Sequence, residues 1–269
     1  MQGDLPDGSG SLARMLRVLG LLSEEPNGLT NSELAERTGI PRPTISRLLA
    51  QLSAIAFVHQ RAGSERFKMG PGVLKLSQAF LDQLNIRAAF REYFQQVAET
   101  AGAAVHLGYR DRLDMVVVEI VQPRSATLFT RQRIGSHMDL VTSALGRAYI
   151  VGLPEVERQA LMRTLVEAGV TTAESFTRAY SHAAQEINDR GCCSSFGEWN
   201  PVIHAVATWI HAPDGEMYSI SCGGPGYLLP PEFLLSNAVQ EMRRAIEQMS
   251  KETGIRSAFD HVASARKRT

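Results

Sequence analysis

Apolar residues recur at steps of three and four along residues 11–55, which is the pattern of amphipathic helices. Residues 1–10 come before this pattern, contain little that could be buried, and are expected to form a flexible tail. The first helix is predicted from Ser11 to the turn at Pro26. A later helix, over 41–55, turns one apolar side inward and a small, polar and basic side outward. Its apolar residues are Ile45, Leu48, Leu49, Leu52 and Ile55.

A short helix with a marked start is predicted between these two. Thr30 can accept a hydrogen bond from the amide of Glu33 while Glu33 reaches back to the amide of Thr30, which is a capping box. Leu29 can pack on Leu34 as a hydrophobic staple. Gly39 suits the left-handed position just past the end of such a helix.

Two short strand-like runs follow, at 57–61 and 66–69, around a turn that contains a glycine. The order helix, helix, turn, helix, hairpin predicts a winged helix-turn-helix over 11–70. Glycine and proline at 70–72 separate it from an apolar helix over 71–85. We interpret that helix as a linker, which packs either on its own domain or on the same helix of a second subunit.

The rest of the chain mixes strand-like and helical patterns, and it predicts a second domain over 86–253. Strands before and after a block of helices favour an α+β domain built on one antiparallel sheet. The strand-like runs are 104–109, 115–121, 126–130, 202–211 and 217–222. The helical runs are 86–101, 143–151, 154–168, 174–189 and 231–253.

Charge adds information only when it is counted by segment. The chain has 269 residues, with 28 Lys and Arg against 28 Asp and Glu. Neutrality excludes a protein that is basic throughout, but it does not exclude a basic surface. Residues 38–68 hold five basic residues against one acidic residue, so the third helix and the hairpin are basic. Residues 254–269 hold four against one, and we expect a basic, flexible and solvated tail there.

Cysteine and histidine spacing gives no metal site. Cys192 and Cys193 are adjacent and Cys222 is isolated, which fits neither a disulfide framework nor a zinc site. His204 and His211 are seven positions apart, so on one strand they point to opposite faces. No metal and no cofactor are expected. The chain also lacks a membrane-length apolar stretch and a signal-peptide pattern, so a cytoplasmic protein is expected.

Enzyme motifs are also missing from the sequence. There is no Gly-rich phosphate loop, no Gly-x-Ser-x-Gly elbow and no His-Glu-x-x-His pair. We therefore expect a protein that is not an enzyme, assign no catalytic residues, and expect the sheet domain to hold a ligand. Two alternatives stay open: a small-molecule-metabolising enzyme with an appended helical docking module, and a protein-binding adaptor that uses the winged helix as its docking surface.

Several segments resemble one family. SLARMLRVLGLL, LTNSELAERTGIPRPTISRLLAQLSAIAFV and RFKMGPGVLKL closely resemble the N-terminal domain of the IclR family of bacterial transcriptional regulators. Four later segments resemble the same family more weakly, namely AVHLGYRD, RIGSHMDLVTSALGRAYI, EINDRG and ISCGGP. The resemblance therefore spans about residues 11–253. It implies a linker helix between the winged helix-turn-helix and a GAF-like effector domain. It also implies a homodimer or tetramer on double-stranded operator DNA, and a repressor or activator of a metabolic, catabolic operon.

The resemblance carries DNA contact over to the third helix, to the start of the second helix and to the hairpin. The implied DNA-binding residues are Thr30, Asn31, Ser32, Arg42, Pro43, Thr44, Ser46, Arg47, Arg61, Arg66 and Lys68.

It also implies a pocket for a small organic acid or an aromatic metabolite. The implied effector-binding residues are Ala144, Leu145, Ser195, Glu198, Ala205, Trp209, Ser221 and Gly223. Ala205 and Gly223 stand where acid-binding members of the family carry polar groups. The absence of those polar groups leaves fewer hydrogen-bond donors in the pocket and is expected to open volume there. Both effects favour a larger or aromatic effector. Trp199, Trp209 and Phe196 are candidate walls; alternatively, the two tryptophans are ordinary core residues.

Overall fold

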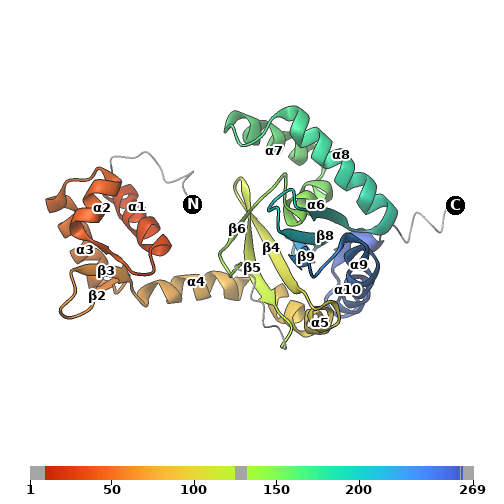
Figure 1. The fold of residues 1–269 in the computed structure, drawn as a ribbon, viewed down its shortest axis with the longest axis horizontal. Coiled ribbons are helices and arrows are strands. Elements are labelled where there is room, and N and C mark those ends of the chain that lie inside the picture. Colours follow the sequence, from red (N-terminus) through yellow and green to blue (C-terminus); the bar gives the residue numbers. More distant parts are fainter. Residues whose placement is uncertain (1–9, 125–131, 261, 263–269) are drawn as a thin grey trace. The chain divides into compact units, whose positions relative to one another are not determined.

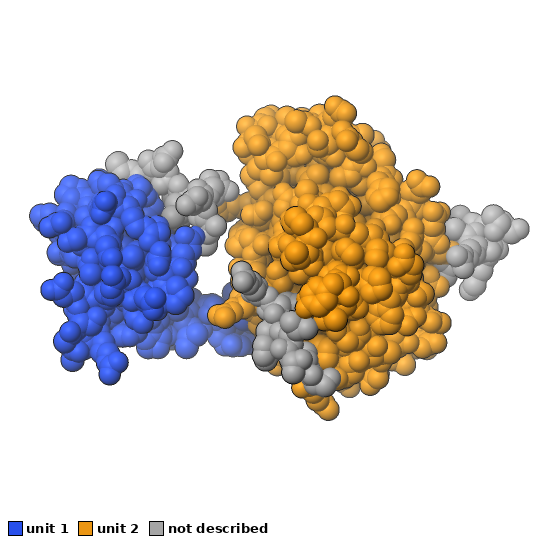
Figure 2. All heavy atoms as spheres, in the orientation of Figure 1, with its two compact units in different colours: residues 1–84 blue, residues 85–269 orange. Residues whose placement is uncertain are grey.

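The computed structural model describes residues 10–124, 132–260 and 262. The chain divides into two compact units, residues 1–84 (unit 1) and 85–269 (unit 2) (Figure 2). Most of the predicted tail 1–10, the predicted strand 126–130 and residues 263–269 of the predicted basic tail lie outside the described residues. In the described part of the chain, no helix is long and apolar enough to cross a membrane.

Unit 1 has the order of elements that the sequence predicts (Figure 1). Its helices are α1 (Ser11–Glu24), α2 (Asn31–Thr38), α3 (Arg42–Ala54) and α4 (Gly72–Gln83). Its strands are β1 (Leu29–Thr30), β2 (Val58–Gln60) and β3 (Arg66–Met69), which form an antiparallel sheet in the order β1-β3-β2. The hairpin β2-β3 is therefore the wing.

The predicted start and end of α2 are confirmed. The Thr30 hydroxyl accepts from the Glu33 amide at 3.2 Å, and the Thr30 amide donates to Glu33 Oε2 at 2.7 Å. Gly39 ends the helix with φ of +69°, where a side chain would be strained. The short strand β1 was not predicted, because Leu29 belongs to a strand only when the wing residue Phe67 lies beside it.

The core of unit 1 is formed by the apolar side of α3 together with α1 and α2. Ile45, Leu48, Leu49 and Leu52 are all buried, as predicted. The prediction is wrong for Ile55, which lies just past the end of the helix and is 56% exposed. No residue of α4 is buried.

Unit 2 is a sheet with helices on both faces (Figure 1). Its strands are β4 (Ala104–Asp111), β5 (Asp114–Val121), β6 (His137–Asp139), β7 (Cys193–Phe196), β8 (Ile203–His211), β9 (Met217–Pro225) and β10 (Arg256–Ser257). Its helices are α5 (Ile86–Ala101), α6 (Ala144–Gly152), α7 (Glu155–Glu167), α8 (Ala173–Arg190), α9 (Pro231–Phe233) and α10 (Val239–Thr253), and a π-helical turn, Leu234–Ala238, joins the last two.

The described strands pair antiparallel in the order β10-β8-β9-β4-β5-β6, and β7 pairs with β8. Helices α5 and α10 pack together on one face, where Arg87 of α5 is 2.8 Å from Glu119 of β5. Helix α6 packs across β8 and β9 on the other face, with α8 against it. We call this second side the α6 face. The predicted antiparallel α+β architecture is confirmed.

Three strands of unit 2 were not predicted, namely β6, β7 and β10, each of four residues or fewer. The prediction of a flexible tail from residue 254 is wrong for residues 254–260. Arg256 and Ser257 pair with His211 and Ile210 at the edge of β8. Phe259 is buried beneath the guanidinium of Arg243, 5.0 Å from its ring centre. A charge count overlooks this apolar anchor.

Candidate functional site

Helix α3 presents a small and basic surface outward. Because its apolar side is buried, the intervening positions face away from the core. Arg42, Pro43, Ser46 and Arg47 are exposed and Thr44 is half-buried. The start of α2 is joined to this surface, since Asn31 Nδ2 donates to Ser46 Oγ at 2.7 Å. The two helices therefore form one polar surface.

Two of the predicted DNA-binding residues at the start of α2, Thr30 and Ser32, differ in how accessible their hydroxyl groups are. The hydroxyl of Thr30 already caps the helix, whereas Ser32 is exposed. The first amides of a helix have no partner inside the helix and attract anions. The hydroxyl of Ser32 is therefore more accessible than that of Thr30.

The basic residues of the wing have two different environments. Arg61 and Lys68 are exposed. Arg66 is also exposed, but it bridges the wing to α2: its guanidinium lies 2.8 Å from Glu33 Oε1 and donates to the Gly28 carbonyl at 2.7 Å. Hydrogen bonds from Thr30, with a smaller contribution from Arg66, lower the pKa of Glu33. Arg66 thus holds the wing beside α2.

The candidate effector residues of unit 2 converge on the α6 face. Ser195, Ala205 and Gly223 are direct neighbours across β7, β8 and β9. Ser221 is two residues from Gly223 on the same strand, so it points to the same side. Ala144 and Leu145 form the first turn of α6 above that side, and both are buried.

Two of the expected aromatic walls do not fit that role. Trp209 is 7% exposed and belongs to a core cluster, with its ring at the position where a side chain of Gly152 would be. Phe196 is opposite His204 and contacts its ring, on the side of β7 that faces away from Ser195. Trp199 is half-buried against the cluster that contains Leu145.

The expectation of open volume at Gly223 is wrong. A Cβ atom at this position would lie 2.6 Å from the Cβ of Ala205 and 2.5 Å from the His204 carbonyl oxygen. The two strands approach so closely here that only glycine fits. The missing side chain is therefore explained by strand packing, whereas Ala205 itself is half-buried.

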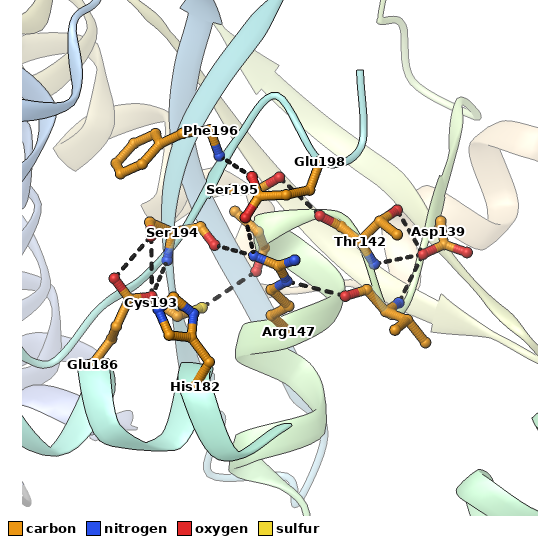
Figure 3. A network of polar contacts seen from close by, with 12 residues as sticks. Asp139, Thr142, Arg147, His182, Glu186, Cys193, Ser194, Ser195, Phe196 and Glu198 are labelled. Carbon is orange, nitrogen blue, oxygen red and sulfur yellow. Dashed lines mark hydrogen bonds and ion pairs between the residues drawn. The ribbon is translucent and has the colours of Figure 1, made fainter. Parts of the chain in front are cut away.

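A polar network joins the start of α6 to β7 (Figure 3). Arg147 of α6 is buried; its Nε donates to the Val141 carbonyl at 3.0 Å, and one terminal nitrogen donates to the Ser194 carbonyl at 2.8 Å and to Glu198 at 2.9 Å. The other carboxylate oxygen of Glu198 accepts from the amide of Phe196. Arg147 thereby fixes the turn that carries Glu198.

Further hydrogen bonds fix the neighbouring hydroxyls. Ser195 Oγ donates to the Thr142 carbonyl at 2.8 Å. Ser194 donates through its amide and its hydroxyl to Glu186 of α8, at 2.9 and 2.8 Å. Asp139 Oδ1 accepts from the amide and the hydroxyl of Thr142, at 2.6 and 2.7 Å. The α6 face is thus held by α6, α8 and β7 together.

Electrostatics keeps Glu198 ionised. Burial raises the pKa of Glu198, but hydrogen bonds, led by the one from Arg147, outweigh burial, so the pKa is lowered. Sequence reasoning missed Arg147 as a positioning residue. A charged residue inside the apolar run ALGRAYI was the available clue, because a buried arginine needs several acceptors.

The chain resembles known proteins in family, sequence and structure. Residues 11–62 match the IclR helix-turn-helix domain, and residues 78–251 match the bacterial transcriptional regulator IclR C-terminal domain. The HTH-type transcriptional regulator TsaQ1/TsaQ2 of Comamonas testosteroni is 28% identical over 246 residues, which cover 90% of this chain and 87% of that protein.

Solved structures of IclR-family proteins have the same fold as this chain. An IclR family transcriptional regulator from Brucella abortus has 32% identity and a TM-score of 0.72, with 92% of this chain and 94% of that chain covered. An IclR homolog from Microbacterium hydrocarbonoxydans, solved with 4-hydroxybenzoate, has the same fold at 16% identity, with a TM-score of 0.71 and coverage of 91% and 100%. These matches are to regulators and not to enzymes. The chain belongs to the IclR family of bacterial transcriptional regulators, with a helix-turn-helix DNA-binding domain and a C-terminal effector domain.

Proposed function

We propose that α3 and the wing bind operator DNA and that an organic acid bound on the α6 face controls this binding. The observation that carries the DNA contact is the outward surface of α3, where Arg42 and Arg47 are exposed beside small side chains. A helix of this kind fits the major groove, where arginine reads guanine. Arg61 and Lys68 are suited to contact phosphates, whereas Arg66 joins the wing to Glu33 of α2.

The DNA proposal is tested by mobility shift on fragments upstream of the gene, at one fixed salt concentration. Arg47→Ala is expected to weaken specific binding by about 1–3 kcal/mol, or roughly 5- to 150-fold, if Arg47 makes a bidentate base contact. Arg178→Ala is the control, because Arg178 is an exposed arginine of α8 in unit 2. Unchanged operator affinity would remove Arg47 from the interface. Weak, sequence-independent and steeply salt-dependent binding by the wild type would favour the adaptor alternative instead.

The effector proposal rests on the start of α6. The amides of Ala144 and Leu145 belong to its first turn, where a carboxylate is stabilised by unpaired N–H groups and the helix dipole. Ser221 adds a hydroxyl on the facing strand β9, whereas the hydroxyl of Ser195 already donates to the Thr142 carbonyl. Thermal-shift screening of glyoxylate, pyruvate, benzoate and 4-hydroxybenzoate tests the class. A response to glyoxylate or pyruvate with none to the aromatic acids would contradict the expectation of a larger or aromatic effector.

We also propose that the protein is a homodimer, or a tetramer built from such dimers, acting in the cytoplasm on a catabolic operon. Leu76 and Phe80 lie one turn apart on α4 and are 60% and 41% exposed. A second copy of α4 would cover them. Leu76→Glu is expected to lower the mass measured by light scattering, whereas Lys75→Glu is the control. Equal masses for both variants would contradict this interface.

A further inference from the structure

Two buried side chains on the strands of unit 2, His106 and Ser219, each have a polar atom without a hydrogen-bond partner among the described residues. His106 of β4 is 5% exposed and Ser219 of β9 is fully buried. Among the described residues, the Nε2 atom of His106 and the hydroxyl of Ser219 lack any partner. Folded proteins leave few such groups, because a buried donor or acceptor without a partner has lost its hydrogen bonds to water. The pair therefore requires an explanation.

Both side chains point to the α6 face, where the candidate effector residues lie. His106 is directly opposite Ser221 in the pairing of β4 with β9. Ser219 is two residues from Ser221 and opposite Gly108. Since Gly108 has no side chain, Leu145 of α6 lies there, with a methyl carbon 3.1 Å from the position of a Cβ. The unpartnered pair thus lies beside Ser221 on the sheet side and Leu145 on the helix side of the proposed effector site.

We propose that His106 and Ser219 are specificity-determining residues that bind a hydroxyl group of the effector, which is therefore a hydroxylated carboxylic acid. This inference rests on the proposed function, in which the acid group binds at the start of α6. It assigns a second polar contact, from β4 and β9, to a different part of the same molecule.

The chemistry of the pair favours a hydroxyl over a charged group. Burial lowers the pKa of His106 to about 4, so its imidazole is neutral at physiological pH. A neutral imidazole and a serine hydroxyl together offer both donors and acceptors. A carboxylate only accepts and would bring an uncompensated charge to neutral partners, and an ammonium only donates. A hydroxyl both donates and accepts, so it can satisfy both residues.

The test compares acids that differ only by a hydroxyl. Isothermal titration measures the affinity of the full-length protein for benzoate, 3-hydroxybenzoate and 4-hydroxybenzoate, and for propionate and lactate. In at least one series the hydroxylated acid is expected to bind the wild type about tenfold more tightly than its parent. His106→Leu and Ser219→Ala are expected to lose this preference and to keep the affinity for the parent acid.

Thr208→Val is the matched control. Thr208 is also buried in the sheet, but its hydroxyl donates to the Gly191 carbonyl at 2.7 Å. This variant is expected to melt at a lower temperature than the wild type and to keep the preference for the hydroxylated acid. Without ligand, His106→Leu and Ser219→Ala are expected to melt at or above the wild-type temperature, because each removes an unsatisfied group.

Each result decides the matter. If acids bind the wild type with no preference for the hydroxyl, or if both variants keep the preference, the inference is overturned while the acid-effector proposal stands. If no acid binds the wild type, both are overturned. If both ligand-free variants melt several degrees below the wild type, a water or a protein group already satisfies the pair, which also overturns the inference.

Discussion

Replacement of Arg147 by methionine tests how the α6 face is held together. The wild-type guanidinium donates to the carbonyls of Val141 and Ser194 and to the carboxylate of Glu198. Methionine keeps much of the aliphatic volume but donates nothing. The variant therefore leaves two carbonyl oxygens without this donor and separates the Glu198 turn from α6.

The magnitude follows from the burial of each partner. A buried acceptor that loses its donor costs about 1–3 kcal/mol, so the two carbonyls set the scale. The Glu198 side chain is 44% exposed and keeps its bond from the Phe196 amide, so its part is about 0–1 kcal/mol. Because the buried guanidinium no longer has to be desolvated, part of the cost is offset. We expect a net loss of about 2–4 kcal/mol, or roughly 5–15 °C in Tm for a unit of this size.

Tryptophan fluorescence during urea unfolding measures this loss in unit 2 alone. The two tryptophans of the chain, Trp199 and Trp209, both belong to that unit. Glu198→Gln is the control: it removes the charge, keeps an acceptor for Arg147, and is expected to cost less than about 1 kcal/mol. The reasoning is refuted if Arg147→Met unfolds within about 0.5 kcal/mol of the wild type, or if Glu198→Gln costs as much as Arg147→Met.

Three further predictions concern stability. Thr30→Ala removes the helix cap and is expected to cost about 1 kcal/mol in chemical unfolding of unit 1; no measurable loss would contradict a working cap. Gly146→Ala would bring a Cβ within 2.3 Å of the Leu140 Cα and is expected to lower stability by about 1–3 kcal/mol, whereas Gly10→Ala, with nothing within 4 Å, should change little; equal effects would contradict the packing. Because burial lowers the pKa of His106 to about 4, the unfolded chain binds one more proton than the native state between about pH 6.5 and pH 4. The free energy of unfolding should therefore decrease as the pH is lowered through that window, by up to about 1.4 kcal/mol per pH unit from this residue. A His106→Leu variant with the same slope as the wild type would contradict this.

The sequence by itself determined most of unit 1, because the information there is local. The capping box at Thr30, the glycine stop at Gly39 and the buried stripe of α3 each involve residues within a few turns of one helix. The outward position of Arg47 follows from that stripe. The exception is Arg66, whose bond to Glu33 spans 33 residues and follows from the pairing of β1 with the wing.

Only the tertiary structure decided how the site of unit 2 is built. Ser195 and Thr142 are 53 residues apart, and Arg147 and Ser194 are 47 apart. Strands as short as β7 and β10 are too brief for a period-two pattern, and their pairing with β8 depends on residues far along the chain. The register of β4 against β9, which sets His106 beside Ser221, has the same origin. Helices are closed by bonds four residues apart, whereas a sheet is closed by distant residues, so the sequence predicted the helix that carries Arg47 but not the assembly of the α6 face.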